Sequence, residues 1–151
     1  MTDKYESMRG ILKLYELRRE ETMRQARDWF LRFDPASAEE VSAAYFGAQS
    51  AHYRMVTSYW DMAAAFVNSG AIDEQLFNDT TTEHVMVFAK VAPFLEELRA
   101  KSGFPRYLSH LEQLVSRLPD AEGQMERLRQ IARGVGRSQP PLREGVGRPR
   151  A

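Results

Sequence analysis

The spacing of hydrophobic residues predicts a long amphipathic helix at the start of the chain. From residue 4 to residue 33, apolar side chains return every three or four positions, and charged residues occupy the opposite face. Asp34-Pro35 ends this run, because the residue before a proline is disfavoured in helical geometry. The apolar stripe consists of Tyr5, Met8, Leu12, Tyr15, Ala26, Trp29 and Phe33, widened by Ile11, Leu14, Met23 and Phe30.

A second helix is predicted over residues 37–68. Ser37-x-x-Glu40 has the pattern of a capping box, and Ser69-Gly70 is a typical stop. Residues 43–51 are mostly small, whereas residues 55–67 are apolar on nearly every side. A helix of that kind is usually the most buried one of its domain.

Capping and proline signals divide the remaining chain. Asp73 predicts a short helical turn. Thr80-x-x-Glu83 predicts a third long helix that ends at Ser102-Gly103 and has a kink or a break at Pro93. Phe104-Pro105 opens a fourth helix that ends at Pro119, and Asp120 caps a weak fifth helix to Arg133. The predicted fold is therefore all-α: an antiparallel bundle of four main helices with a weak fifth. Residues 1–133 form a single domain, and residues 134–151 a disordered Gly/Pro/Arg-rich tail.

The net charge of zero conceals an uneven distribution. Residues 1–32 carry eight basic and six acidic side chains, residues 33–126 carry six and fourteen, and residues 127–151 carry seven and one. An acidic body is opposite in sign to a nucleic-acid-binding surface. Contact with nucleic acid is therefore expected only through the basic tail.

The composition bears on location as well. The chain has no cysteine, which excludes disulfides and thiolate metal sites and is typical of a reducing cytoplasm. No uncharged apolar run approaches the roughly 20 residues that span a bilayer. We expect a cytoplasmic protein without a membrane helix.

A search for catalytic chemistry yields no motif. His52, His84 and His110 form no Glu-x-x-His or His-x-x-x-His pair, and no glycine-rich phosphate loop or Gly-x-Ser-x-Gly turn occurs. We expect no cofactor, no metal site and no enzymatic activity.

One polar constellation lies within the apolar second helix. Arg54, Ser58 and Asp61 share a face, and Tyr59 and Trp60 flank them. These residues are a candidate site for a small ligand. The alternative is structural: Arg54 and Asp61 pair with each other or with the first helix, because a charge on so apolar a helix is costly without a partner.

The segments VTSYWDMAAAFVNSGAIDEQLF, FAKVAPFLEELRAK and YLSHLEQLV together resemble a bacterial family of all-helical domains of unknown function, over about residues 55–116. The resemblance implies a helical fold and carries no activity. Our leading functional hypothesis is a non-enzymatic protein–protein interaction module. The apolar face of its first helix is wider than one neighbouring helix covers, so we expect the protein to be homo-oligomeric. The alternatives are a ligand-binding bundle with its pocket on the second helix, and nucleic-acid contact through the tail.

Overall fold

The computed structural model describes residues 3–138, and all of its regular structure is helical. The described residues contain α1 (Lys4–Arg18), α2 (Glu21–Arg32), α3 (Ala38–Phe46), α4 (Ser50–Asn68), α5 (Glu74–Thr80), α6 (Glu83–Val91), the 3-10 helix η1 (Ala92–Phe94), α7 (Leu95–Ser102), α8 (Ser109–Ser116) and α9 (Ala121–Ser138). The all-α prediction is confirmed. The bundle of four main helices is not, because the chain divides into more and shorter helices than the hydrophobic pattern suggests.

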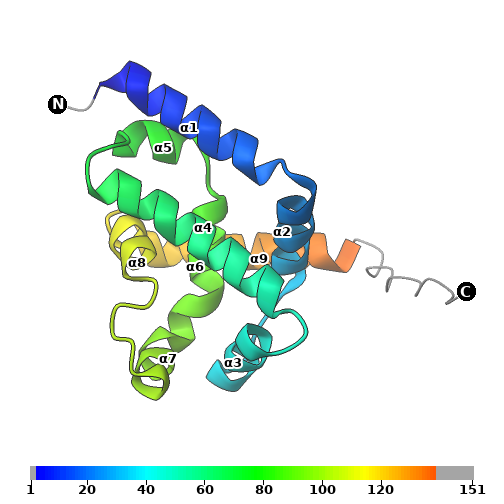
Figure 1. The fold of residues 1–151 in the computed structure, drawn as a ribbon. Helices are drawn as coiled ribbons and strands as arrows, with labels where there is room; N and C mark the ends of the chain where they lie inside the picture. The colour runs from blue at the N-terminus through cyan, green and yellow to red at the C-terminus, as the bar shows by residue number, and fades with distance from the viewer. Residues whose placement is uncertain (1–2, 139–151) are drawn as a thin grey trace, which may run out of the picture.

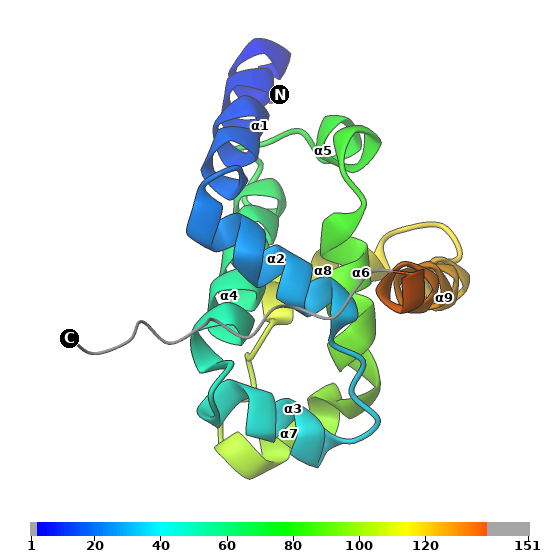
Figure 2. The same cartoon turned by 90° about the vertical axis from the view of Figure 1, so that its right-hand side faces the viewer.

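Helix α4 crosses the middle of the molecule and organises the others (Figure 1). Helices α2 and α8 pack on α4, while α6 packs against α8 and α9. Helix α1 runs along one edge beside α5, and α3 lies beside α7 at the opposite end (Figure 2). The fold therefore has a central core and two peripheral helix pairs.

The most continuous burial occurs in α6 rather than in α4. Every residue from His84 to Val91 is buried, whereas α4 keeps Met62 and Phe66 about two-fifths exposed. The expectation that residues 55–67 form the most buried helix is therefore wrong. Helix α6 lies between α4, α8 and α9, and neighbours on several sides leave it no face toward solvent.

The predicted helix over residues 4–33 is two helices. Helix α1 ends at Arg18, and the Glu20 carboxylate accepts hydrogen bonds from the backbone N–H groups of Thr22 and Met23 at 3.0 and 2.9 Å. Glu20 thus acts as the N-cap of α2, and these bonds lower the pKa of its carboxyl group. The break lets α1 and α2 pack on different parts of the body.

The predicted helix over residues 37–68 is also two helices, separated at Gly47. A Cβ atom on Gly47 would lie 2.5 Å from the carbonyl oxygen of Ala43, so only glycine permits this turn. The Ser37 hydroxyl accepts from the N–H of Glu40 as predicted, at 3.2 Å. The Glu40 carboxylate, however, accepts from the N–H of Ala36 rather than that of Ser37.

Later boundaries differ from the predictions in similar ways. Thr80 ends α5, where its hydroxyl donates to the carbonyls of Leu76 and Phe77, and α6 starts only at Glu83. The break at Pro93 is confirmed as η1. The fourth helix begins not at Pro105 but after Leu108, whose φ of 55° interrupts helical geometry.

The last helix is longer than expected. Helix α9 continues past Arg133 to Ser138, so the first residues of the predicted tail are helical. The predicted disorder of residues 139–151 lies outside the described residues. Across the described part of the chain, no helix combines the length and apolar character needed to cross a bilayer.

Candidate functional site

A groove of about 880 Å³ opens between α3, α7 and the segment that leads into α8. Its lining includes Tyr53 of α4. The lining residues are Val41, Ser42, Tyr45, Phe46, Tyr53, Leu98, Lys101, Ser102, Phe104, Pro105, Arg106 and Tyr107. A concave, mainly apolar lining with few polar groups is typical of ligand sites.

The floor of the groove is fixed by a pair of tyrosines. The hydroxyl oxygens of Tyr53 and Tyr107 are 2.6 Å apart and share a hydrogen bond. Burial raises the pKa of Tyr107 to about 12 and also raises that of Tyr53, so both hydroxyls stay protonated at neutral pH. The Tyr45 ring packs edge-on against Tyr53, with ring centroids 5.8 Å apart.

The rim of the groove combines exposed aromatic rings with positive charge. Phe46 is 82% exposed and Phe104 is 71% exposed. Lys101 and Arg106 line the groove, and none of its lining residues is acidic. Lys101 pairs with Glu97 at 3.0 Å in an exposed i,i+4 arrangement that contributes little to stability.

The residues selected from sequence do not converge on one cavity. Arg54 donates to the Ser50 hydroxyl, and the Ser58 hydroxyl donates to the carbonyl of Met55, both at the surface of α4. The Tyr59 hydroxyl donates to the carbonyl of Leu14 and so ties α4 to α1. Each side chain thus engages a neighbour on its own helix or on the adjoining one.

The other two selected residues face inward. Trp60 is fully buried in the core, and the guanidinium of Arg18 lies 5.3 Å from the centre of its ring. The Asp61 carboxylate accepts from the N–H of Leu111 at 3.0 Å. Arg54 and Asp61 therefore bond to different partners and not to each other.

Asp61 acts as a cap for a helix to which it does not belong. Leu111 lies in the first turn of α8, and Leu108 at the start of that helix offers no side-chain cap. We expect Asp61→Ala to lower the free energy of unfolding by about 1–2 kcal/mol, because the N–H of Leu111 loses its acceptor. Urea denaturation measures this. The exposed Asp79→Ala is the control, with an expected change within about 0.5 kcal/mol, and equal effects would contradict the capping role.

A second candidate surface is the outer face of α1. Tyr5, Met8, Leu12 and Tyr15 are between 42% and 62% exposed and recur at intervals of three, four and three residues. We call these four residues the α1 stripe. The opposite face of α1 holds the helix on the body, because Leu14 is buried and the Ser7 hydroxyl accepts from the N–H of Asp73 at 2.9 Å.

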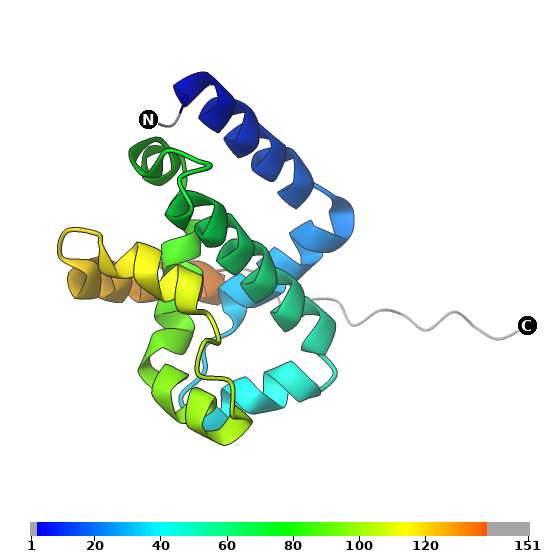
Figure 3. The same cartoon turned by 60° about the vertical axis from the view of Figure 1, so that its left-hand side comes forward.

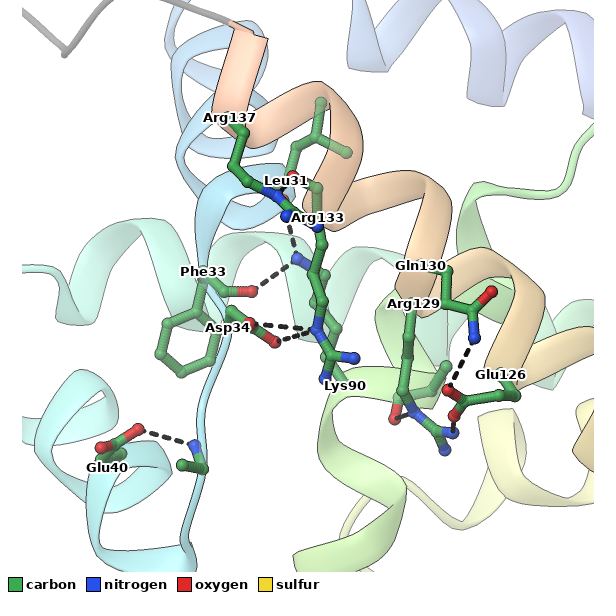
Figure 4. Close-up of polar contacts among 12 residues, drawn as sticks. Leu31, Phe33, Asp34, Glu40, Lys90, Glu126, Arg129, Gln130, Arg133 and Arg137 are labelled. Carbon is green, nitrogen blue, oxygen red and sulfur yellow. Dashed lines mark hydrogen bonds and ion pairs between the residues drawn. The ribbon is translucent and has the colours of Figure 1, made fainter.

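A basic cluster lies where α6, α9 and the end of α2 meet (Figure 4). Buried Lys90 donates from Nζ to the carbonyls of Phe30, Leu31 and Phe33, at 3.0, 2.7 and 2.5 Å. Nearby Arg133 pairs with Asp34 at 3.1 Å, and Arg129 pairs with Glu126 at 2.7 Å. These cations are engaged by groups of the protein itself, so the cluster joins helices.

The histidines lie apart. His84 is buried, and its Nε2 lies 3.2 Å from Oδ1 of Asn78; His52 contacts Gln49 at the surface. Among residues 3–138, no three His, Asp or Glu side chains gather in an arrangement suited to a metal ion. His84 Nδ1 and Trp60 Nε1 are buried without a hydrogen-bond partner in the described structure.

The described residues thus define an all-helical domain with an apolar, positively rimmed groove and a first helix that exposes one apolar face. The chain belongs to the family described as Domain of unknown function (DUF4760), whose model matches residues 6–118. The resemblance drawn from residues 55–116 is confirmed, and the match also includes α1 from Glu6 onward and the residues that line the groove. Comparison with curated proteins and with solved structures gives no match.

Proposed function

We propose that this protein is a non-enzymatic helical interaction module that associates with a second copy of itself through the α1 stripe. The exposure of four large apolar side chains on one face of one helix carries the proposal. Surfaces of this kind usually mark interaction sites.

The fold leaves the α1 stripe uncovered while it secures the rest of the helix. Helix α1 contacts α5 and α2 and lies at the edge of the molecule (Figure 3). Intervals of three and four residues are the spacing at which paired helices interlock their side chains. A neighbouring helix can therefore pack on the stripe without any rearrangement of the body.

The charges beside the stripe favour a second copy as the occupant. Glu6, Arg9, Lys13 and Glu16 follow one flank, with both signs present in equal number. Glu6 pairs with Arg9, and Lys13 with Glu16, only loosely at 3.7 Å, so these side chains can exchange partners. A flank of mixed sign is complementary to its own copy, whereas a strongly acidic or basic partner meets as much repulsion as attraction.

Light scattering on a gel-filtration column, over a range of concentrations, tests the proposal. We expect the wild-type chain to form a dimer or larger assembly and Leu12→Glu to raise its dissociation constant at least tenfold, because the new carboxylate would be buried without a partner. Leu17→Glu is the matched control: Leu17 is 46% exposed on the same helix but lies outside the stripe, and its variant should associate normally. A wild-type monomer at every concentration, or equal effects of the two variants, refutes the proposal.

One other hypothesis has a test of its own. Nucleic-acid contact through residues 134–151 predicts salt-sensitive binding that is lost when this segment is deleted. A cytoplasmic location is also part of the proposal, and the absence of cysteine supports it. The ligand-binding hypothesis now concerns the groove instead of the pocket expected on the second helix. The groove includes Tyr53 of α4 but not the face that carries Arg54, Ser58 and Asp61.

A further inference from the structure

We propose that the groove between α3, α7 and residues 104–107 binds a small organic anion with an apolar body. The ligand would lay its aromatic or aliphatic part against the walls and direct its anionic group to Arg106 and Lys101. This site is separate from the α1 stripe and does not depend on self-association.

The walls of the groove suit the apolar part of such a ligand. Val41 and Leu98 are buried at its base, and the aromatic rings of Tyr45, Phe46 and Phe104 surround them. The volume of about 880 Å³ is within the range of small-molecule sites. A bound molecule would cover the exposed rings of Phe46 and Phe104, and removal of that apolar surface from water favours binding.

The floor is already formed. Tyr53 is fully buried, and the hydrogen bond between the Tyr53 and Tyr107 hydroxyls joins α4 to the segment before α8. The Arg99 guanidinium donates to the carbonyl of Tyr107 at 2.7 and 3.0 Å and holds this segment against α7. Two elements of the groove are thus fixed before a ligand arrives, which reduces the ordering that binding requires.

The charges of the lining residues favour a negatively charged ligand. Both charged residues of the lining are cations, and within the described residues no carboxylate pairs with Arg106. The Lys101 partner, Glu97, is 57% exposed, so an incoming anion can compete for the ammonium group. A guanidinium offers a carboxylate or sulfonate two parallel hydrogen bonds.

The test compares two fluorescent probes that share one ring system. 1-Anilinonaphthalene-8-sulfonate carries an anionic group, and N-phenyl-1-naphthylamine lacks it. We expect the anionic probe to bind the full-length chain at least tenfold more tightly, and Arg106→Glu to remove most of that preference. Phe104→Ala should weaken both probes, because it removes one apolar wall.

Two variants act as controls. Arg54→Glu makes the same charge change on exposed α4 outside the groove, and Leu12→Glu alters the α1 stripe. Both should bind the anionic probe as the wild type does. The proposal is overturned if neither probe binds, if both bind equally, if Arg106→Glu and Arg54→Glu have equal effects, or if Leu12→Glu alone abolishes binding. The expected binding of the anionic probe does not require self-association, because Leu12→Glu, which should dissociate the assembly, is expected to bind the probe as the wild type does; self-association can therefore fail while the groove proposal stands.

Discussion

Replacing Lys90 by methionine should destabilise the protein by about 3 kcal/mol. The ammonium group donates to the carbonyls of Phe30 and Leu31 in the last turn of α2 and to that of Phe33 at its C-cap, where a cation is favoured by the helix dipole. The Phe30 carbonyl also accepts from the N–H of Phe33. Methionine fills a similar volume but donates no hydrogen bond. The carbonyls of Leu31 and Phe33 would then be left without this donor in the interior, and the loss of a charged donor to buried groups has a cost of this size.

The charge state of Lys90 is consistent with this role. Burial lowers the pKa of Lys90 to about 8, while the negative charge of Asp34 acts in the opposite direction. At pH 7 the amine is therefore still mostly protonated. The charged Lys90 amine therefore donates its hydrogen bonds to the carbonyls at the end of α2 at neutral pH.

Guanidinium denaturation of Lys90→Met at pH 7 measures the effect. Lys101→Met is the matched control, because Lys101 is exposed and its pairing with Glu97 contributes little; we expect a change within about 0.5 kcal/mol. Hydrogen exchange should also accelerate at the end of α2 in the Lys90 variant. Equal stability of the two variants would show that the carbonyls do not depend on Lys90.

The sequence predicts helices well where the signal is local. The Ser37 cap, the break at Pro93 and the end of the second helical run near Ser69 all depend on residues within one or two turns of each other. The break after Arg18 was visible in part, since Arg19 and Thr22 interrupt the apolar stripe. The remaining signal is weak, because the N-cap of α2 is Glu20 and glutamate is not among the residues preferred at that position.

The candidate sites were harder to predict because their members come from distant segments. Tyr53 and Tyr107 are 54 positions apart, and Lys90 bonds to carbonyls 57 to 60 positions away. No spacing rule joins such residues. A signal did exist for Lys90, a single charge within the apolar run HVMVFAKVA, which indicates a buried cation that needs acceptors.

For Arg54 and Asp61, the sequence pattern suggested a shared site that the structure does not contain. Their spacing places them on one side of α4, but that side is divided between solvent and the start of α8. Asp61 bonds to a backbone N–H, and a backbone partner leaves no trace in the pattern of side chains. The pattern therefore identified a residue that needs a partner without identifying the partner.

Acid should destabilise the protein through His84. Because Oδ1 of Asn78 can only accept, the Nε2 atom of His84 carries the proton and Nδ1 is left as a buried acceptor without a partner. A proton on Nδ1 would place a charge among the rings of Phe77 and Trp60, whose centroids lie 4.8 and 5.9 Å from that of the imidazole. Burial, assisted by the charge of Arg18, accordingly lowers the pKa of His84 from 6.5 to about 4.

The sign of the effect follows from which state binds the proton first. In the unfolded chain the pKa of His84 is near 6.5, so below that pH the unfolded state binds a proton at His84. The folded state does not bind this proton until about pH 4. The contribution is therefore complete above pH 6.5 and is lost as the pH falls to 4, by about 3 kcal/mol at about 1.4 kcal/mol per pKa unit. Urea denaturation of the wild type and of His84→Gln between pH 7.5 and 4 isolates this loss, because carboxylates contribute equally to both. The stability of His84→Gln should fall less steeply with acid, whereas His52→Gln, at a partly exposed position on α4, should follow the wild type; parallel curves for all three proteins would show that His84 is not the group responsible.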